Sequence, residues 1–358
     1  MTYRSRLLGA AGVCALAVLG ANPAYAAGTT AGSTITNTVS VAFQVGGIAQ
    51  TSTTASDTLT VDRSISLTVA EVGTTTTTVN PGSTNQVTAF TVTNTSNAPL
   101  DFALAVAQQT GGAGAHSNTD NFNVSNVRIF RDNPTTGTVG SYDAGDALVT
   151  YLDEIAADGS ATVFVLGDVA LGQANGSVAA VTLTATGREA GGAGSQGAAL
   201  TQTAGANTAA MDTVFADGAG ATDGLRDAAF SAKDDYTVSA ATLTAIKSSR
   251  IVSDPINGGT NPKMIPGATI QYCIAISNAS GSASATSVTV TDPIPANLTY
   301  DATFGVKTNG TATIASGVAT CAADTSGTGT MASNTVSGTL ASVAGGETKT
   351  VVFQATIN

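Results

Sequence analysis

The chain contains 358 residues, with 13 Lys and Arg, 24 Asp and Glu, one His, three Cys and no Trp. Charged residues make up 10% of the chain, whereas an average soluble domain has roughly 25%. Hydrophobic residues reach 42%, so there is enough apolar material for folded cores. The net charge of −11 excludes a basic surface for nucleic acid, because nothing balances the phosphates. With one His and scattered carboxylates, we do not expect an ordinary hydrolase or metalloenzyme.

Residues 1–26 have the pattern of a secretory signal peptide. Two arginines precede the apolar run 7–19, and small residues at positions 24 and 26 predict cleavage before Ala27. The run is too short to span a membrane. Cys14 lies inside it without the small preceding residue that lipidation needs. We therefore expect export to the periplasm, the cell surface or the medium, with no membrane insertion after cleavage.

Short alternating segments rich in Thr and Val dominate the rest of the chain. Clear examples are residues 90–93, 163–165 and 288–291. β-branched side chains suit a pleated surface, and Gly, Asn, Asp and Pro separate the segments at turn spacing. The sequence therefore predicts an all-β fold built of β-sandwiches.

An internal repeat indicates two such sandwiches. Pro81-Gly82 leads into the strand and polar turn 90–96, and Pro266-Gly267 leads into the similar stretch 274–280. Each copy ends in a turn and an apolar strand. A repeat of this length is a whole domain, so we predict tandem Ig-like β-sandwiches over 66–187 and 241–358.

Two regions lie outside the repeat. Residues 27–65 form a short N-terminal β segment with strand-like runs at 40–45 and 58–61, on either side of Gly46-Gly47. A piece of about 40 residues buries too little surface to fold alone. It must therefore pair with the first sandwich or with another chain. Residues 188–240, rich in Gly, Ala and then Asp, are interpreted as a long connecting loop.

The second copy carries recognisable runs at 254–258, 261–268, 272–274 and 290–295. They resemble the repeat of prokaryotic secreted and surface proteins called domain of unknown function eleven, in its proteobacterial variant. The resemblance is strong over 241–358 and weak over 66–187. It implies an Ig-like β-sandwich on a secreted or envelope protein, and it implies no reaction.

The residues of this motif have structural explanations. Alternating Ile and Tyr side chains from position 270 to 276 give one buried strand face. A Pro-Gly turn precedes that strand, and an Asn closes its far end through hydrogen bonds to local backbone. Two prolines end the following strand because they cannot donate to the ladder. The residues concerned are Pro266, Gly267, Asn278, Asp292, Pro293 and Pro295.

Cys273 and Cys321 are the only cysteines after the signal. Because an exported protein meets an oxidising compartment, we expect them to form a disulfide rather than two free thiols. Cys273 lies on the strand face opposite the alternating Ile and Tyr side chains. The segment around Cys321 must then cover that face.

Two groups of acids are candidate calcium ligands, although neither follows an established calcium motif. Solvated surface acids are the favoured interpretation, and no other cofactor is expected. One group lies at 143–158 and the other at 212–235; their members are Asp143, Asp146, Asp153, Glu154 and Asp158, and Asp212, Asp217, Asp223, Asp227, Asp234 and Asp235.

Lys247 on the first strand and Asn358 on the last strand of the second copy suggest an isopeptide bond assisted by Asp292. The alternative is an exposed Lys and a frayed terminal Asn, because chain ends usually fray.

His116 lies in the Gly-rich, flexible stretch 111–118. We therefore expect a solvent-exposed side chain. No Ser/His/Asp spacing, HExxH or G-x-S-x-G motif occurs, so no enzymatic activity is expected.

These patterns predict a non-enzymatic structural or interaction protein of the cell envelope. Its partners would be other copies of itself or other envelope proteins, and the N-terminal strands would join a neighbour by strand addition. The alternative is an adhesin or a carbohydrate-binding module. Stacking surfaces for sugars are poorly supplied, since the chain has no Trp and only seven Tyr.

Overall fold

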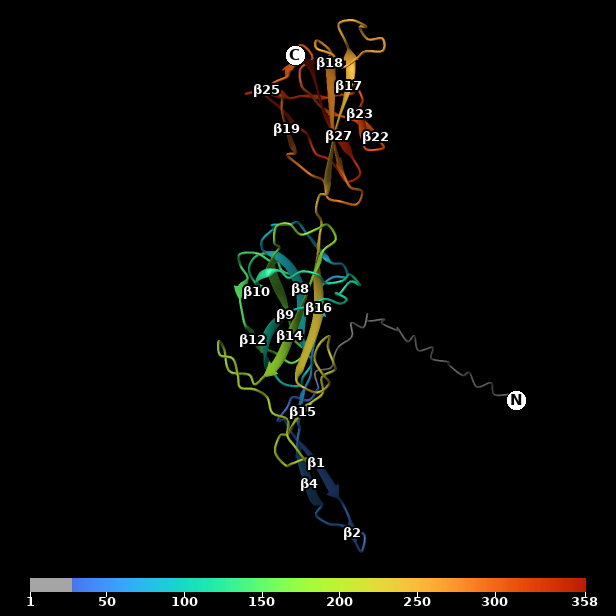
Figure 1. The fold of residues 1–358 in the computed structure, drawn as a ribbon. Coiled ribbons are helices and arrows are strands. Elements are labelled where there is room, and N and C mark those ends of the chain that lie inside the picture. The colour runs from blue at the N-terminus through green and yellow to red at the C-terminus, as the bar shows by residue number, and fades with distance from the viewer. Residues whose placement is uncertain (1–27) are drawn as a thin grey trace, which may run out of the picture.

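The computed structural model describes residues 28–358, so the predicted signal peptide lies outside the described residues. The described part is all-β, and two Ig-like sandwiches confirm the predicted fold class. Figure 1 shows three parts in a row, with an N-terminal β-hairpin at one end, the first sandwich in the middle and the second sandwich at the other end. Within residues 28–358, no helix is long and apolar enough to cross a membrane.

The N-terminal segment pairs with itself. Strand β1 (Thr34–Val41) runs antiparallel to β4 (Thr53–Thr60), and the short strands β2 (Gln44–Val45) and β3 (Ile48–Ala49) form the tip. Gly46 and Gly47 both have positive φ, as a two-residue hairpin turn with the right twist requires. The prediction that 27–65 pairs with the first sandwich or another chain was therefore incomplete, because β1 and β4 form backbone hydrogen bonds with each other.

The first sandwich has two five-stranded layers. The first layer has the order β11-β10-β13-β8-β6 and the second β12-β9-β14-β16-β7. The strands are β6 (Leu67–Glu71), β7 (Thr77–Val79), β8 (Gln86–Asn94), β9 (Leu100–Gln108), β10 (Ser125–Arg131), β11 (Ala147–Leu148), β12 (Tyr151–Ile155), β13 (Ser160–Asp168), β14 (Val178–Arg188) and β16 (Ala229–Val238).

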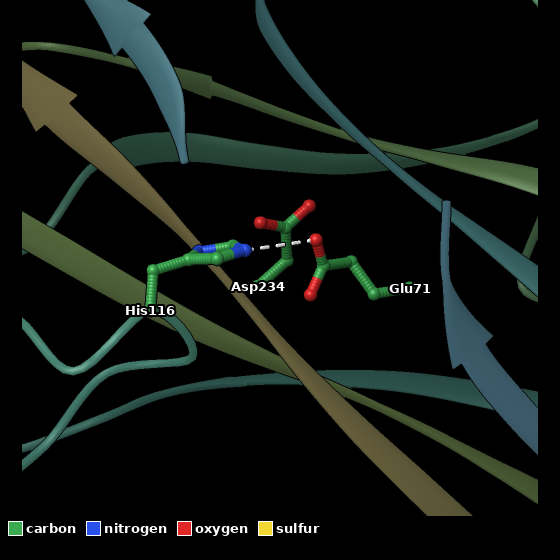
Figure 2. A group of neighbouring side chains, drawn as sticks. All are labelled: Glu71, His116 and Asp234. Atoms are coloured by element: carbon green, nitrogen blue, oxygen red, sulfur yellow. Dashed lines mark hydrogen bonds and ion pairs between the residues drawn. The ribbon is translucent and has the colours of Figure 1, made fainter. Parts of the chain in front are cut away.

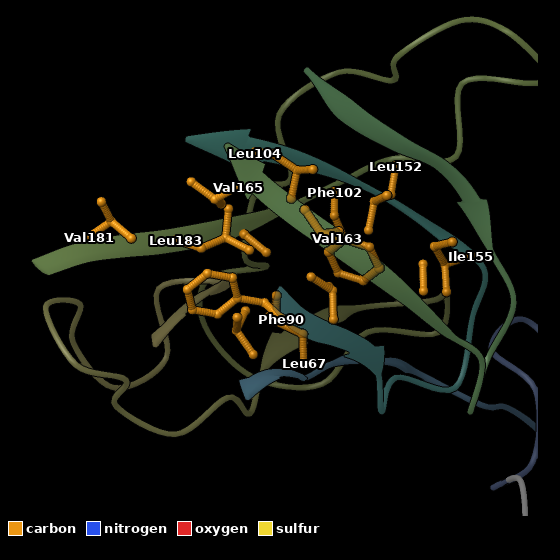
Figure 3. Packing of buried hydrophobic residues seen from close by; sticks show 14 of the residues in the cluster. Leu67, Phe90, Phe102, Leu104, Leu152, Ile155, Val163, Val165, Val181 and Leu183 are labelled. Atoms are coloured by element: carbon orange, nitrogen blue, oxygen red, sulfur yellow. The ribbon is translucent and has the colours of Figure 1, made fainter. Parts of the chain in front are cut away.

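A single apolar core fills the space between these layers. Leu67, Phe90 and Val163 from one layer face Phe102 and Leu183 from the other, all of them fully buried (Figure 3). Alternate residues along β8 are buried, as the period of a pleated strand requires. Thr91 and Thr93 occupy the less buried positions between them, whereas Thr88 is itself buried.

Residues 188–240 are not a connector between the sandwiches. They contain β15 (Thr213–Phe215), which pairs with β5 (Arg63–Ile65), and β16, which pairs along its length with β14. The first sandwich thus extends to Val238, and the predicted boundary at 187 separates β14 from its partner. The misassignment has a physical cause: β16 contains Lys233, Asp234 and Asp235, and its two acids are buried.

The second sandwich has a larger and a smaller layer. The first has the order β17-β18-β27-β21-β24, with β20 also on β27, and the second is β19-β26-β25. The strands are β17 (Leu243–Ser253), β18 (Thr269–Asn278), β19 (Thr289–Pro293), β20 (Leu298–Tyr300), β21 (Lys307–Gly310), β24 (Gly327–Thr328), β25 (Thr330–Ala332), β26 (Thr335–Thr339) and β27 (Thr348–Ile357), beside a hairpin of β22 (Ala312–Ala315) and β23 (Val318–Cys321).

Strand order relates the two sandwiches. The order β6-β8-β13-β10 in the first has the same chain sequence and pairing as β17-β18-β27-β21 in the second. Strands β9 and β12 likewise correspond to β19 and β26. Strands β14 and β16, however, follow the closing strand β13, and the described part of the second sandwich has no counterpart of them.

Candidate functional site

The N-terminal hairpin has one polar and one apolar face. On the polar face every position of both strands is Thr or Ser, and hydroxyl groups bond across the strands, as in Thr36–Thr58 at 3.1 Å and Thr38–Ser56 at 2.8 Å. The other face is largely apolar: it carries Ile35, Val39, Val41, Ala55 and Leu59, interrupted by the pair Asn37–Asp57 and by Thr53 near the tip. An alternating Thr/apolar pattern from 34 to 41 could have shown this from the sequence.

Nothing in the described chain covers the apolar face. Ile35, Val39, Val41 and Leu59 remain 45–57% exposed, and Asp57 is the only charged side chain between 28 and 61. The hairpin joins the first sandwich only at its base, where the Ala31 N–H donates to the Asn97 carbonyl at 3.0 Å. A two-stranded hairpin alone in water is marginally stable, so this face favours association.

A groove opens at one edge of the second sandwich, between β17 and β19. Its volume is ≈ 490 Å³, and its apolar lining comes chiefly from Leu243, Ile274, Ile276, Val288 and Val290. Among the described strands, β17 pairs only with β18 and β19 only with β26. Two unpaired strand edges therefore flank an apolar groove.

Lys247 and Asp292 bridge this groove with an Nζ–Oδ2 distance of 2.6 Å. The sequence grouped them correctly, but it wrongly added Asn358. Lys247 lies opposite Ile274, and Ile274 opposite Val351. Asn358 follows Val351 by seven residues, about 23 Å along a strand. It is held instead by the Thr299 hydroxyl and the Ala296 carbonyl, so an isopeptide bond to Lys247 is excluded.

The disulfide between Cys273 and Cys321 is formed, as predicted. Cys273 points away from the main core of its sandwich and packs with Ala275, Ala319 and Cys321 in a small separate cluster. The bond fastens the β22–β23 hairpin against that outer face, where the Ala319 N–H also donates to the Ser248 hydroxyl at 2.8 Å. This is a structural crosslink.

The Pro-Gly and Asn motif residues hold strand ends. Gly267 has φ +85°, which Gly adopts without strain, in the turn between Pro266 and β18. The Asn278 side chain donates to the carbonyls of Ala283 and Val343 and accepts from the Thr242 N–H. Asn278 is buried, and it ties β18 to the next connection and to the strand region before β27.

The two prolines act at the end of β19. Pro293 is the last residue of that strand and lies opposite Thr335 of β26. Pro295 follows it and begins a turn in which its carbonyl accepts from the Leu298 N–H. Both positions agree with the prediction that they terminate the strand.

The predicted calcium ligands are not gathered at one point. Asp143 and Asp146 share a loop, where they accept backbone N–H groups within 132–146. Asp153 instead accepts from the Gly194 N–H, and Asp158 has φ +59° in a turn. These carboxylates fix loop backbones.

The second acidic group is divided in the same way. Asp212 accepts from Thr208, Asp217 from the N–H groups of Asp227 and Ala228, and Asp223 from Gly220. Within residues 28–358, the one group of three or more His, Cys, Asp or Glu side chains with metal-ligating proximity includes none of them except Asp234.

That group consists of Glu71, His116 and Asp234, and the prediction of an exposed His116 was wrong. Figure 2 shows the carboxylates of Glu71 and Asp234 beside the Nε2 edge of the imidazole. Nε2 lies 3.0 Å from Glu71 Oε1, and Nδ1 lies 3.1 Å from Asp235 Oδ1. The His116 side chain is only 16% exposed. Strand β6, the loop after β9 and strand β16 supply these residues, which sequence spacing could not relate.

A second groove, with a volume of ≈ 1160 Å³, lies where the hairpin meets the first sandwich. It is lined mostly by Thr, Ser and other small or polar residues, with Val61, Ser96 and Asn97 among them, and no lining residue is aromatic. This groove does not provide a stacking surface for sugars, and nothing in its lining favours the carbohydrate-binding alternative.

The fold and the exposed hairpin define a tandem Ig-like β-sandwich protein. No family model and no curated protein matches the sequence. Among solved structures, the Streptococcus agalactiae AgI/II polypeptide BspA C-terminal domain aligns with 81% of this chain and 91% of its own, at 6% identity and a TM-score of 0.33. A putative membrane-anchored protein from Corynebacterium diphtheriae aligns with 91% and 89%, at 11% identity and a TM-score of 0.20. These scores are too low to support an argument about function.

Proposed function

We propose that the protein is a non-enzymatic structural protein of the bacterial cell envelope, exported and assembled outside the cytoplasm. In this proposal each copy inserts its N-terminal hairpin into the second sandwich of the next copy, and chains of subunits grow head to tail. The resemblance to the surface-protein repeat and the signal-like N-terminus support the location. The uncovered apolar face of the hairpin carries the proposal.

The first sandwich serves as a template for the completed second sandwich. In the first sandwich, the antiparallel pair β14 and β16 extends the layer that contains β9, and β14 pairs directly with β9. Strand β19 corresponds to β9 and lacks such a partner. The hairpin is also an antiparallel pair with one apolar face, so a second copy can supply in trans what β14 and β16 supply in cis.

Geometry and charge agree with head-to-tail assembly. The hairpin and the second sandwich lie at opposite ends of the molecule (Figure 1). A contact between two different surfaces does not close on itself, and it propagates. The full-chain net charge of −11 opposes association elsewhere, whereas the hairpin carries a single charge, Asp57, on its largely apolar face.

Sedimentation velocity of the exported chain, lacking residues 1–26, tests this function. We expect concentration-dependent oligomers that are lost in Ile35→Thr/Val39→Thr, because these changes keep β-branched residues but make the apolar face polar. Both residues are about half exposed, so the variant should fold. The matched control Thr38→Ser changes the opposite face and should assemble normally. A monomeric parent chain at high concentration would refute the proposal.

A further inference from the structure

The cluster around His116 has no part in the proposed assembly, yet within residues 28–358 it is the one group of three or more His, Cys, Asp or Glu side chains whose ligating atoms come this close together. We propose that Glu71, His116 and Asp234 bind a divalent transition metal ion of the zinc class, and that Asp235 orients the imidazole for this purpose.

Donor geometry supports the site. One ligating atom from each of the three residues lies within 4.8 Å of the other two. Zn²⁺ binds imidazole nitrogen and carboxylate oxygen at about 2.0–2.2 Å, and three protein ligands with one open position is a common arrangement. The nitrogen donor and the small number of oxygens argue against Ca²⁺, which takes six to eight oxygen ligands.

Asp235 supplies the outer support that metal-binding histidines usually have. Its fully buried carboxylate accepts the His116 backbone N–H at 3.1 Å through Oδ2, and Oδ1 lies 3.1 Å from Nδ1. With the Nδ1 hydrogen directed at Asp235, the other ring nitrogen is left facing Glu71 and Asp234. A carboxylate that holds the non-ligating nitrogen fixes the tautomer and makes the ligating one more basic.

Charge balance gives a second reason for a cation. Three carboxylates surround one imidazole, and within residues 28–358 no Lys or Arg forms an ion pair with Glu71, Asp234 or Asp235. Asp234 is 3% exposed, and while its Oδ1 accepts the Asp235 N–H, its Oδ2 accepts no hydrogen bond from residues 28–358. A divalent ion would compensate this excess of negative charge.

The surroundings of the cluster are built to hold it in place. Within the loop that carries His116, the Gly114 N–H donates to the Asn118 carbonyl at 2.6 Å, and Ala113 bridges to Thr119. On the strand side, the Thr76 hydroxyl donates to the Asp235 carbonyl at 3.0 Å. A bound ion would therefore join β6, β16 and the loop at the edge where the two layers of the first sandwich meet.

Because His116 is the only histidine, an untagged protein gives an imidazole NMR signal from one residue. The Ile35→Thr/Val39→Thr background keeps the sample monomeric, so that failure of the site and failure of assembly can be told apart. We expect one Zn²⁺ per chain by isothermal titration calorimetry, with a shift of the His116 ring signals. Ca²⁺ at the same concentration should leave those signals unchanged.

Variants identify the ligands. Glu71→Gln and Asp234→Asn should each weaken Zn²⁺ binding at least 10-fold, and Asp235→Asn should weaken it by about 10–100-fold. The control Asp143→Asn, in a remote acidic loop, should leave the affinity unchanged. Absence of saturable Zn²⁺ binding by the parent protein would overturn the proposal, as would binding that leaves the His116 signals unmoved. The parent measurements decide the question even if a variant fails to fold.

Discussion

Asn94 and Asn278 occupy the same place in the two sandwiches, at the end of β8 and of β18. Asn94 donates to the carbonyls of Ala98, Ile155 and Ala156, and Asn278 to those of Ala283 and Val343. A Pro-Gly turn with positive φ at Gly82 or Gly267 precedes each strand. The frame of the sandwich is thus specified twice by the same local chemistry.

The two sandwiches differ in how the frame is completed. In the first, β14 and β16 widen the second layer, and the Tyr236 hydroxyl donates across the core to the Val165 carbonyl at 2.9 Å. In the second, a disulfide fastens an outer hairpin while the edge of β19 stays open. The comparison teaches that one repeat is completed within the chain, while the other leaves the edge of β19 unpaired beside an open groove.

Glu71 and Lys247 occupy equivalent positions on the first strands of the two repeats, and their surroundings show the same difference. Glu71 of β6 lies opposite Phe90, which is four residues before Asn94. Lys247 of β17 lies opposite Ile274, which is four residues before Asn278. Glu71 meets His116 in a buried cluster, whereas the half-exposed Lys247 meets Asp292 across an open groove. The same edge is therefore closed in one sandwich and accessible in the other.

Removing the disulfide should have the largest effect, and it should be confined to one sandwich. The bond closes a loop of 48 residues, for which the chain-entropy model gives about 4 kcal/mol. Cys273→Ala/Cys321→Ala should therefore increase hydrogen exchange in peptides from β18 and β27. Peptides from β8 and β13 serve as the internal control, and equal loss of protection in both sandwiches would contradict the separation.

The pH dependence should have opposite signs in the two sandwiches. Asp234 titrates near 7 when folded and near 3.8 when unfolded, so its contribution destabilises the first sandwich as pH rises from about 4 to 7. His116 acts in the same direction. Burial alone would lower the pKa of its imidazole, but the hydrogen bond to Asp235 and the charge of Glu71 outweigh burial, so the net shift is upward. Its stabilisation is full below pH 6.5 and is lost as pH rises through the folded pKa.

In the second sandwich, backbone hydrogen bonds led by that of Asn257 lower the pKa of Asp254 to about 2. That stabilisation is present above pH 3.8 and is lost as pH falls toward 2. Hydrogen exchange in each sandwich, corrected for intrinsic rates and with a metal chelator present, should show the first sandwich losing on the order of 3 kcal/mol between pH 5 and 8. The second sandwich should instead lose stability when the pH is lowered from 5 toward 2. Asp234→Asn should remove most of the slope in the first sandwich, and an unchanged slope would assign it to other groups.

Truncating either Asn should cost an intermediate amount. Asn94→Ala and Asn278→Ala each leave buried carbonyls without donors, at a cost of about 2 kcal/mol to the sandwich that contains the change. The free energy of unfolding from chemical denaturation measures this loss, and hydrogen exchange of peptides from each sandwich shows which of the two is affected. If Asn278→Ala destabilised the first sandwich as much as the second, the equivalence of the two frames would be wrong.

Removing the Lys247–Asp292 ion pair should have the smallest effect. Lys247 is 46% exposed, and such pairs contribute at most about 1 kcal/mol. Because the Asp292 side chain is only 11% exposed, both charges must be removed together: Lys247→Met/Asp292→Asn keeps the apolar stem, leaves no unpaired carboxylate and should leave the thermal midpoint nearly unchanged. A large fall in the midpoint would contradict this and show that the ion pair is a main support of the contact between β17 and β19.

Much of the frame could be predicted from sequence because its signals are local. Alternation around Ile274, the Pro-Gly turns and the oxidising compartment were enough to predict the sandwiches and the Cys273–Cys321 bond. The strand β16 was missed because its charged residues gain their burial only from tertiary neighbours. His116 was missed for the same reason, since its partners lie 45 and 119 positions away.

The hairpin falls between these cases. Its Gly46-Gly47 turn was noticed, but the strands were placed at 40–45 and 58–61 instead of 34–41 and 53–60. Exposed strands show no burial, so only the Thr/apolar alternation distinguishes them. The unpaired edge of β19 exists only once the second sandwich has folded, so no local sequence pattern reveals it.

Mixing two defective copies tests the central claim most directly. Ile35→Thr/Val39→Thr has an intact groove, and Leu243→Lys places a charge at the groove mouth, where the parent side chain is 42% exposed. Each variant alone should sediment as a monomer. The mixture should form a one-to-one heterodimer and nothing longer, because the intact hairpin of one copy meets the intact groove of the other. A mixture that stays monomeric, or that forms long oligomers, would contradict head-to-tail completion of the second sandwich.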